Sequence, residues 1–181
     1  MPSIYVASLS DYNNGCLHGV WIDFYKCNDI SEVWQAIHSM LAASPTAKKY
    51  GDTAEEWAIH DYEEWPFKLR EYENISTLWE VYALLQGEID AGEWDAFAEF
   101  LENQGTDISE IDTDTVVDFR EAYQGNYDSK EDFAEELANA AGLLECMPDN
   151  LKAYFDYEAY ARDLFISDYW MSDSGNVFLY I

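Results

Sequence analysis

The sequence predicts an α+β protein with small mixed α/β domains at both ends and a helical middle domain. Three observations lead to this prediction. Patterns typical of β-strands occur near both ends of the chain, at residues 3–9, 18–25 and 165–181. Residues 76–141 instead repeat their apolar side chains with the period of a helix. The segment 71–119 is strongly acidic, yet it holds enough aromatic side chains to bury, so we expect it to fold.

These patterns predict three domains: an N-terminal α/β domain over 1–62, a helical domain over 63–104 and a C-terminal α/β domain over 105–181. Polar residues that precede apolar periodic stretches predict the helix starts, and they are Asp29, Ser76, Ser129 and Asn150. A turn is expected at 11–15 and a surface loop at 43–51. The type of structure at 55–61 stays open, and residues 165–181 are expected to form a hairpin.

Residues 91–103 show how a folded segment can display its charges. Trp94, Phe97, Ala98 and Leu101 follow the spacing of one apolar helix face. The acids Asp95, Glu99 and Glu102 follow the same spacing, each one residue after a member of the apolar face. This predicts a charged stripe on the exposed side of the helix. Like charges at this spacing repel by a few tenths of a kcal/mol per pair. The lack of an interposed lysine is therefore an informative feature.

The charge of the chain is large and uneven. The formal net charge is −28, and residues 71–119 contribute fourteen acids without a single lysine, arginine or histidine. A charge of this size repels nucleic acid and anionic membranes and attracts a basic partner. Duplex DNA carries one charge per about 1.7 Å, so this net charge equals that of roughly 48 Å of duplex. General acidity, for solubility or for a salty environment, is the simplest alternative, but it does not require a folded segment to lack every base.

The sequence gives little support to several other classes of protein, namely membrane proteins, secreted proteins, metalloproteins and enzymes. No apolar run is long enough to cross a membrane, and the N-terminus lacks the features of a secretory signal, which predicts a cytoplasmic protein. The cysteines Cys16, Cys27 and Cys146 lack the spacing of a metal site and are expected to be free thiols. Neither a nucleophile motif nor a phosphate-binding loop is present. Paired carboxylates beside aromatic residues leave a glycosidase as a weak alternative.

Four stretches resemble the ArdA antirestriction family. The first begins Ile4-Tyr-Val-Ala-Ser-Leu, the second is Glu55-Glu-Trp-Ala-Ile-His-Asp-Tyr-Glu followed by Pro66-Phe, and the third is Phe155-Asp-Tyr-Glu-Ala-Tyr-Ala-Arg-Asp. The segment from Trp94 to Gly105 is similar to the antirestriction motif of that family. The resemblance covers nearly the whole chain.

The resemblance implies an elongated homodimer that joins through its C-terminal part and is carried by a mobile genetic element. It implies a non-enzymatic inhibitor whose surface carboxylates imitate DNA phosphates. The implied partner is a type I restriction–modification enzyme, at the methyltransferase core formed by its specificity and modification subunits, in a bacterial cytoplasm. An acidic decoy or chaperone-like module for another basic DNA-binding protein remains the alternative.

No catalytic residue, metal ligand or cofactor is predicted. The expected partner-binding residues are the acids of the segment 80–118, with the acids of 121–136 as a second set. They are Glu80, Glu88, Asp90, Glu93, Asp95, Glu99, Glu102, Asp107, Glu110, Asp112, Asp114, Asp118, Glu121, Asp128, Glu131, Asp132, Glu135 and Glu136.

Overall fold

The computed structural model of the chain describes residues 1–89, 91–145 and 147–181. It confirms the predicted class, since helices and two small antiparallel sheets make up the fold. The chain divides into two compact units. Unit 1 comprises residues 1–98 and 106–112, and unit 2 comprises residues 99–105 and 113–181. The three-domain division and the elongated arrangement stay predictions.

Unit 1 is built on a three-stranded antiparallel sheet of order β2-β1-β3. The strands are β1 (Ser3–Ser8), β2 (Gly19–Asp23) and β3 (Trp57–Glu63). Side chains alternate between the two faces of a strand, so every second residue points into the core. Both strands expected near the N-terminus are confirmed, and the undecided stretch at 55–61 belongs largely to β3.

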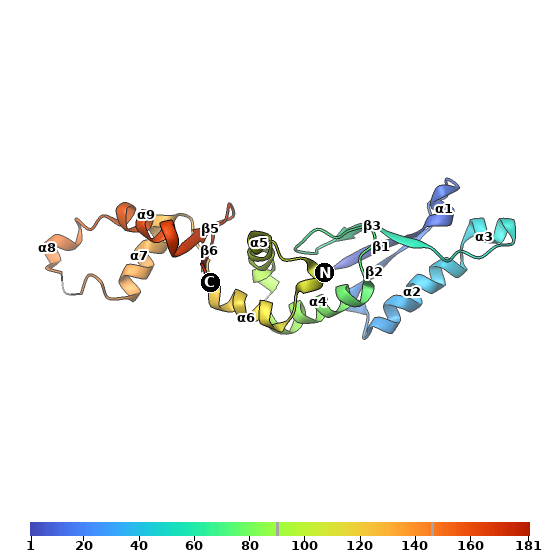
Figure 1. Ribbon diagram of the computed structural model, residues 1–181, viewed down its shortest axis with the longest axis horizontal. Helices are drawn as coiled ribbons and strands as arrows, with labels where there is room; N and C mark the ends of the chain where they lie inside the picture. The colour runs from blue at the N-terminus through green and yellow to red at the C-terminus, as the bar shows by residue number, and fades with distance from the viewer. Residues whose placement is uncertain (90, 146) are drawn as a thin grey trace. The chain divides into compact units, whose positions relative to one another are not determined.

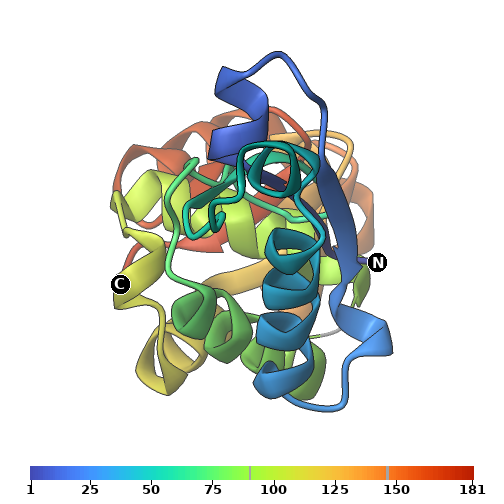
Figure 2. The same cartoon turned by 90° about the vertical axis from the view of Figure 1, so that its right-hand side faces the viewer.

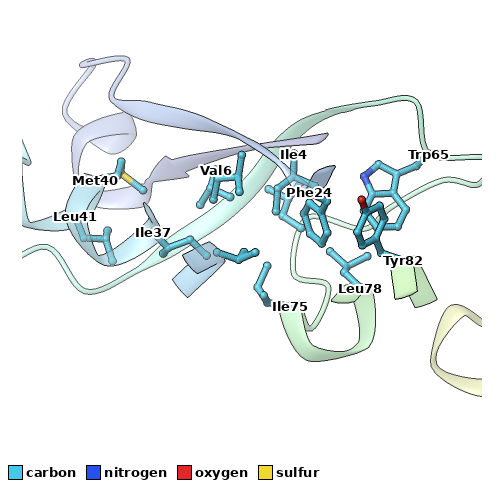
Figure 3. Packing of buried hydrophobic residues seen from close by; sticks show 13 residues of the cluster. Ile4, Val6, Phe24, Ile37, Met40, Leu41, Trp65, Ile75, Leu78 and Tyr82 are labelled. Atoms are coloured by element: carbon cyan, nitrogen blue, oxygen red, sulfur yellow. The ribbon is translucent and has the colours of Figure 1, made fainter. Parts of the chain in front are cut away.

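The core of unit 1 lies between this sheet and the helices α2 (Ile30–Ala42) and α4 (Ile75–Glu88), both on the same side of the sheet (Figure 1). Asp29 caps α2 as predicted, because its side chain accepts a hydrogen bond from the Ser31 N–H. Phe24, in the 3-10 helix η1 (Phe24–Lys26), is fully buried at the centre of the core. Its ring packs against those of Trp65 and Tyr82, with centroid distances of 5.1 and 5.5 Å (Figure 3).

Two short helices occupy the segments expected to be irregular, α1 (Leu9–Asn13) and α3 (Pro45–Tyr50), which lie side by side (Figure 2). The predicted loop at 43–51 was therefore wrong, and the turn predicted at 11–15 is confined to residues 14 and 15, after the end of α1. The reason is local. Ser44 accepts a hydrogen bond from the Ala47 N–H at the start of α3, and a proline at the first helical position needs no N–H partner.

A buried carboxylate links these two short helices. Asp11 of α1 is fully buried, and its Oδ1 accepts a hydrogen bond from the Thr46 N–H of α3 at 2.8 Å. Its Oδ2 has no partner with full hydrogen-bond geometry among the described residues. Burial alone would raise the pKa of this carboxyl. Hydrogen bonds from Ser44, Thr46 and Ser8 outweigh that effect and hold the pKa below its usual range.

The acidic segment folds into helices, as the sequence predicts. After α4 come the 3-10 helix η2 (Ala91–Glu93), α5 (Trp94–Gln104), the 3-10 helix η3 (Ile108–Glu110) and α6 (Thr113–Ala122). The predicted cap at Ser76 was wrong by two positions, because the Asn74 side chain accepts from the Ser76 N–H at 2.8 Å. Helix α5 contributes to both units, with the division after Ala98.

Unit 2 contains a second antiparallel sheet, of order β4-β6-β5. Its strands are β4 (Tyr123–Asn126), β5 (Tyr169–Met171) and β6 (Asn176–Leu179). Strands β5 and β6 form the expected hairpin, although the first residues of 165–181 belong to a helix. Strand β4 was not predicted, because its four residues are too few to show an alternating pattern.

The remaining helices of unit 2 are α7 (Lys130–Ala140), α8 (Asp149–Lys152) and α9 (Tyr157–Ser167). Ser129 caps α7 as predicted, by accepting from the Asp132 N–H at 3.1 Å. The single helix expected to start at Asn150 is instead split into α8 and α9. Asp156 interrupts it and caps α9, since its side chain accepts from the Ala159 N–H.

Aromatic side chains form the core of unit 2. Phe119 and Phe178 are fully buried, and Phe100 lies within 5.8 Å of the first and 6.1 Å of the second, between ring centroids. Trp170 stacks on Phe178 at 4.2 Å. These contacts join α5, α6 and the sheet into one hydrophobic core.

The turn between β5 and β6 requires a glycine at position 175. Gly175 has φ +91°, and an added Cβ would contact the backbone oxygen of Tyr127. We therefore expect Gly175→Ala to lower the free energy of unfolding, measured with denaturant, by about 2 kcal/mol. Gly87→Ala is the control. It lies in α4 with open space around an added Cβ, and should stabilise by about 0.5–1 kcal/mol. Equal effects of the two changes would contradict this account.

Candidate functional site

Most of the predicted partner-binding acids are exposed on helices or on the turns beside them. The exposed members are Glu80, Asp95, Glu102, Glu110, Asp112, Asp114, Asp118, Glu121, Asp128, Glu131, Asp132, Glu135 and Glu136. Glu93, Glu99 and Asp107 are half-buried. Asp90 and the side chain of Glu88 lie outside the described part of the structure. For the acids on helices, exposure follows from helical periodicity, because each helix turns its apolar face towards a core.

Helix α5 shows this arrangement directly. Phe97 and Leu101 are buried at 1% and 4% exposure, while Asp95 and Glu102 on the same helix are exposed. The helix is therefore as predicted, but its apolar face is only partly so, because Trp94 and Ala98 are half-buried while Phe100, outside the predicted face, is buried. The indole Nε1 of Trp94 donates to the Ile89 carbonyl at 3.3 Å and fixes the start of the helix. The side chains of the stripe are carried on a regular backbone.

Glu99, the middle acid of that stripe, has a structural role that the sequence did not reveal. Its Oε1 accepts from the Ser174 hydroxyl at 2.6 Å, and its Oε2 accepts from the Asn176 amide at 2.8 Å. Burial raises the pKa of Glu99, but hydrogen bonds from Asn176, Ser174 and Ser172 outweigh it and lower the pKa overall. This carboxylate ties α5 to the hairpin of unit 2.

Removing the charge of Glu99 should weaken unit 2. We expect Glu99→Gln to lower the free energy of unfolding by about 1–2 kcal/mol, because charge-assisted hydrogen bonds at both oxygens are lost or weakened. Glu102→Gln is the matched control, an exposed acid on the same helix that should change the unfolding free energy by less than about 0.5 kcal/mol. Urea unfolding of both variants tests this, and equal stability would contradict the assigned role.

Asp107 also combines charge with a local structural role. It forms a capping box with Glu110 at η3 and pairs with the Arg70 guanidinium. The backbone hydrogen bond from Ser109 is the main reason why the pKa of Asp107 is lowered, and its side chain and Arg70 add to it. The sequence spacing of Asp107 and Glu110 already had the form of a capping box. The pairing with Arg70 had no local signal.

The described part of the chain also holds cysteines and histidines, residue types that can bind metals or transfer protons. Among residues 1–89, 91–145 and 147–181, no three His, Cys, Asp or Glu side chains group as metal ligands. Cys16 and Cys27 are free and partly buried, and Cys146 lies outside the described residues. The His60 Nε2 lies 3.9 Å from the Glu71 Oε1, and the Tyr12 ring packs edge-on against the imidazole at 4.7 Å.

Helices of the length and hydropathy required to cross a membrane do not occur among the described residues.

The fold and the exposed carboxylates define a class: an acidic α+β protein that displays its charge on helices rather than on a disordered tail. Within this class, the chain belongs to the ArdA family, described as "Antirestriction protein (ArdA)", which matches residues 4–178. The resemblance noted in the sequence is thereby confirmed. Antirestriction is the function of the family, whose members are non-catalytic inhibitors that act on restriction–modification enzymes. No curated protein sequence matched the chain.

Proposed function

We propose that the chain blocks type I restriction–modification enzymes by mimicking duplex DNA. The observation that carries this proposal is the distribution of charge on folded structure. Residues 71–119 hold fourteen acids and no base. They form α4, α5, η3 and most of α6, and the side chains of Glu80, Asp95, Glu102, Asp114 and Asp118 are exposed on these elements.

The physical basis is competition for basic residues that normally contact phosphates. Cations released from duplex DNA on protein binding supply much of the affinity of such contacts. Carboxylates held on helices can occupy the same basic residues without the flexibility of a disordered chain. The proposed site is the DNA-binding groove of the methyltransferase core, formed by the specificity and modification subunits. Binding is spread over many weak contacts, so no single acid is essential.

The proposal includes a homodimer that joins through the C-terminal part of the chain. It also places the protein in a bacterial cytoplasm, encoded by a mobile genetic element that would otherwise be cut on entry. Neither nucleic acid nor a membrane is a proposed partner, because the net charge of −28 opposes both.

A competition experiment tests the proposal. The purified protein should displace a labelled duplex from a purified type I methyltransferase, and rising salt should weaken its binding to the enzyme. If several basic residues are engaged, raising salt from 50 to 200 mM should reduce the affinity by at least about a hundredfold. An acidic protein of similar charge but unrelated fold is the control. Failure to displace DNA, or equal displacement by the control, would refute mimicry.

A further inference from the structure

The sheet of unit 1 has one face that α2 and α4 leave uncovered (Figure 1). Its central row is set by the strand register: Tyr5 of β1 pairs with Trp21 of β2 on one side and with Asp61 of β3 on the other. Directly opposed side chains in such pairs lie about 5 Å apart at Cβ. An aromatic pair and a carboxylate therefore stand next to one another on this face.

The two aromatic rings are held in place by the strands beneath them. Their centroids are 5.4 Å apart with the planes tilted by 46°. A Cβ on Gly19 would lie 2.6 Å from the Tyr5 ring, which shows that this ring lies over the glycine of the neighbouring strand. Tyr5 is half-buried, whereas Trp21 is 44% exposed. The indole is thus a large apolar surface that remains open to solvent.

Acidic residues also lie on this face of the sheet, near the rings of Tyr5 and Trp21. Ser3, two residues before Tyr5, pairs with Asp23 and Glu63, which places both acids next to the central row. Asp23 already binds the Lys26 ammonium at 3.0 Å. Asp61 and Glu63 are exposed and form no ion pair within residues 1–89. Both carboxylates therefore lie on β3, on the opposite side of Tyr5 from the exposed indole of Trp21, and the Asp61 Oδ1 accepts from the Tyr62 N–H at 2.9 Å.

We propose that Tyr5, Trp21, Asp61 and Glu63, which we call the sheet patch, bind an arginine side chain on an exposed segment of a protein partner. A planar guanidinium can stack on the pair of rings and at the same time donate hydrogen bonds to Asp61 beside Tyr5. A lysine ammonium cannot make both contacts with the same geometry. The inference is independent of DNA mimicry, because it predicts a choice between two cations of equal charge.

The choice of occupant follows from charge complementarity. The net charge of −28 attracts cations everywhere on the molecule, and the sheet patch adds an aromatic surface to that attraction. A second copy of the same acidic chain would bring more carboxylates to Asp61 and Glu63, and repulsion opposes that occupant.

Two synthetic peptides of equal length and charge test the proposal, one with arginine and one with lysine at alternate positions between glycines. Titration of the full chain at about 0.15 M salt should show the arginine peptide binding about three- to tenfold more tightly, the range that a cation–π contact supplies. Trp21→Leu should abolish this preference. The control Tyr72→Leu, an aromatic residue 69% exposed and outside the patch, should leave it intact.

Asp61→Asn supplies a second variant that leaves the rings unchanged. It should weaken the arginine peptide more than Asp52→Asn, which removes the same charge from an exposed site elsewhere in unit 1. Equal binding of the two peptides by the unmodified protein would overturn the proposal. So would a preference that persists in Trp21→Leu, or self-association that Trp21→Leu removes, since the last result would assign the patch to a second copy.

Discussion

Inhibition of a type I restriction enzyme should be lost when five exposed acids of α5 and α6 are replaced together by amides. The five are Asp95, Glu102, Asp114, Asp118 and Glu121. Each is exposed, and amides keep nearly the same size, so the fold should persist. If each contact contributes about 0.5–1 kcal/mol, five amides should weaken inhibition by about a hundredfold or more. Any single change of this set should alter inhibition by less than about fivefold.

A matched control separates charge pattern from total charge. The control variant removes five exposed acids that lie outside the proposed set: Asp52, Glu55, Glu56, Glu158 and Asp173. Its net charge equals that of the first variant, and its inhibition should fall far less. Inhibition is measured as the concentration that halves DNA cleavage at fixed salt. Retained inhibition by the first variant, or an equal loss in both, would remove the proposed acids from the binding surface.

Local signals predicted the fold well where a cap and an apolar period coincide. Asp29 before α2 and Ser129 before α7 are examples, because each cap bonds to a main-chain N–H two or three residues later. The short helix α3 lies where the sequence predicts a loop at 43–51, because six residues are too few to show a helical period. The dipeptide Ser44-Pro45 is nevertheless typical of a helix start, and Gly51 in the left-handed conformation ends that helix.

The exposed acids could be predicted because helical period alone decides which side faces solvent. The roles of Glu99 and Asp107 could not be predicted in the same way. Glu99 bonds to Ser174, 75 positions later, and Asp107 pairs with Arg70, 37 positions earlier. Such contacts depend on the tertiary fold, and no spacing in the sequence indicates them. The acids of this chain are therefore of two kinds: those that stabilise the fold through tertiary contacts, and those that are exposed to solvent and available to a partner.

Asp11 belongs to the first kind, and removing it should have the largest effect on stability. Asp11→Ala should lower the free energy of unfolding by about 3 kcal/mol, because the half-buried Thr46 N–H loses its acceptor and the buried hydroxyls of Ser8 and Ser44 lose the carboxylate beside them. Asp11→Asn keeps one oxygen acceptor and should cost about 1–2 kcal/mol. The exposed Asp52→Asn is the control, with an expected change below about 0.5 kcal/mol. Urea unfolding at pH 7 measures all three.

The pH dependence gives a sharper test of the same carboxylate. Its pKa is lowered in the folded protein, so the unfolded chain takes up a proton first as the pH falls. The stability that Asp11 contributes is therefore complete above the unfolded value of about 3.9 and is lost progressively below it. The stability difference between the natural protein and Asp11→Asn should stay constant from pH 7 to about pH 5 and shrink as the pH falls below about 4. A difference that grew in acid would mean that the folded protein holds Asp11 protonated, contrary to the hydrogen bonds that surround it.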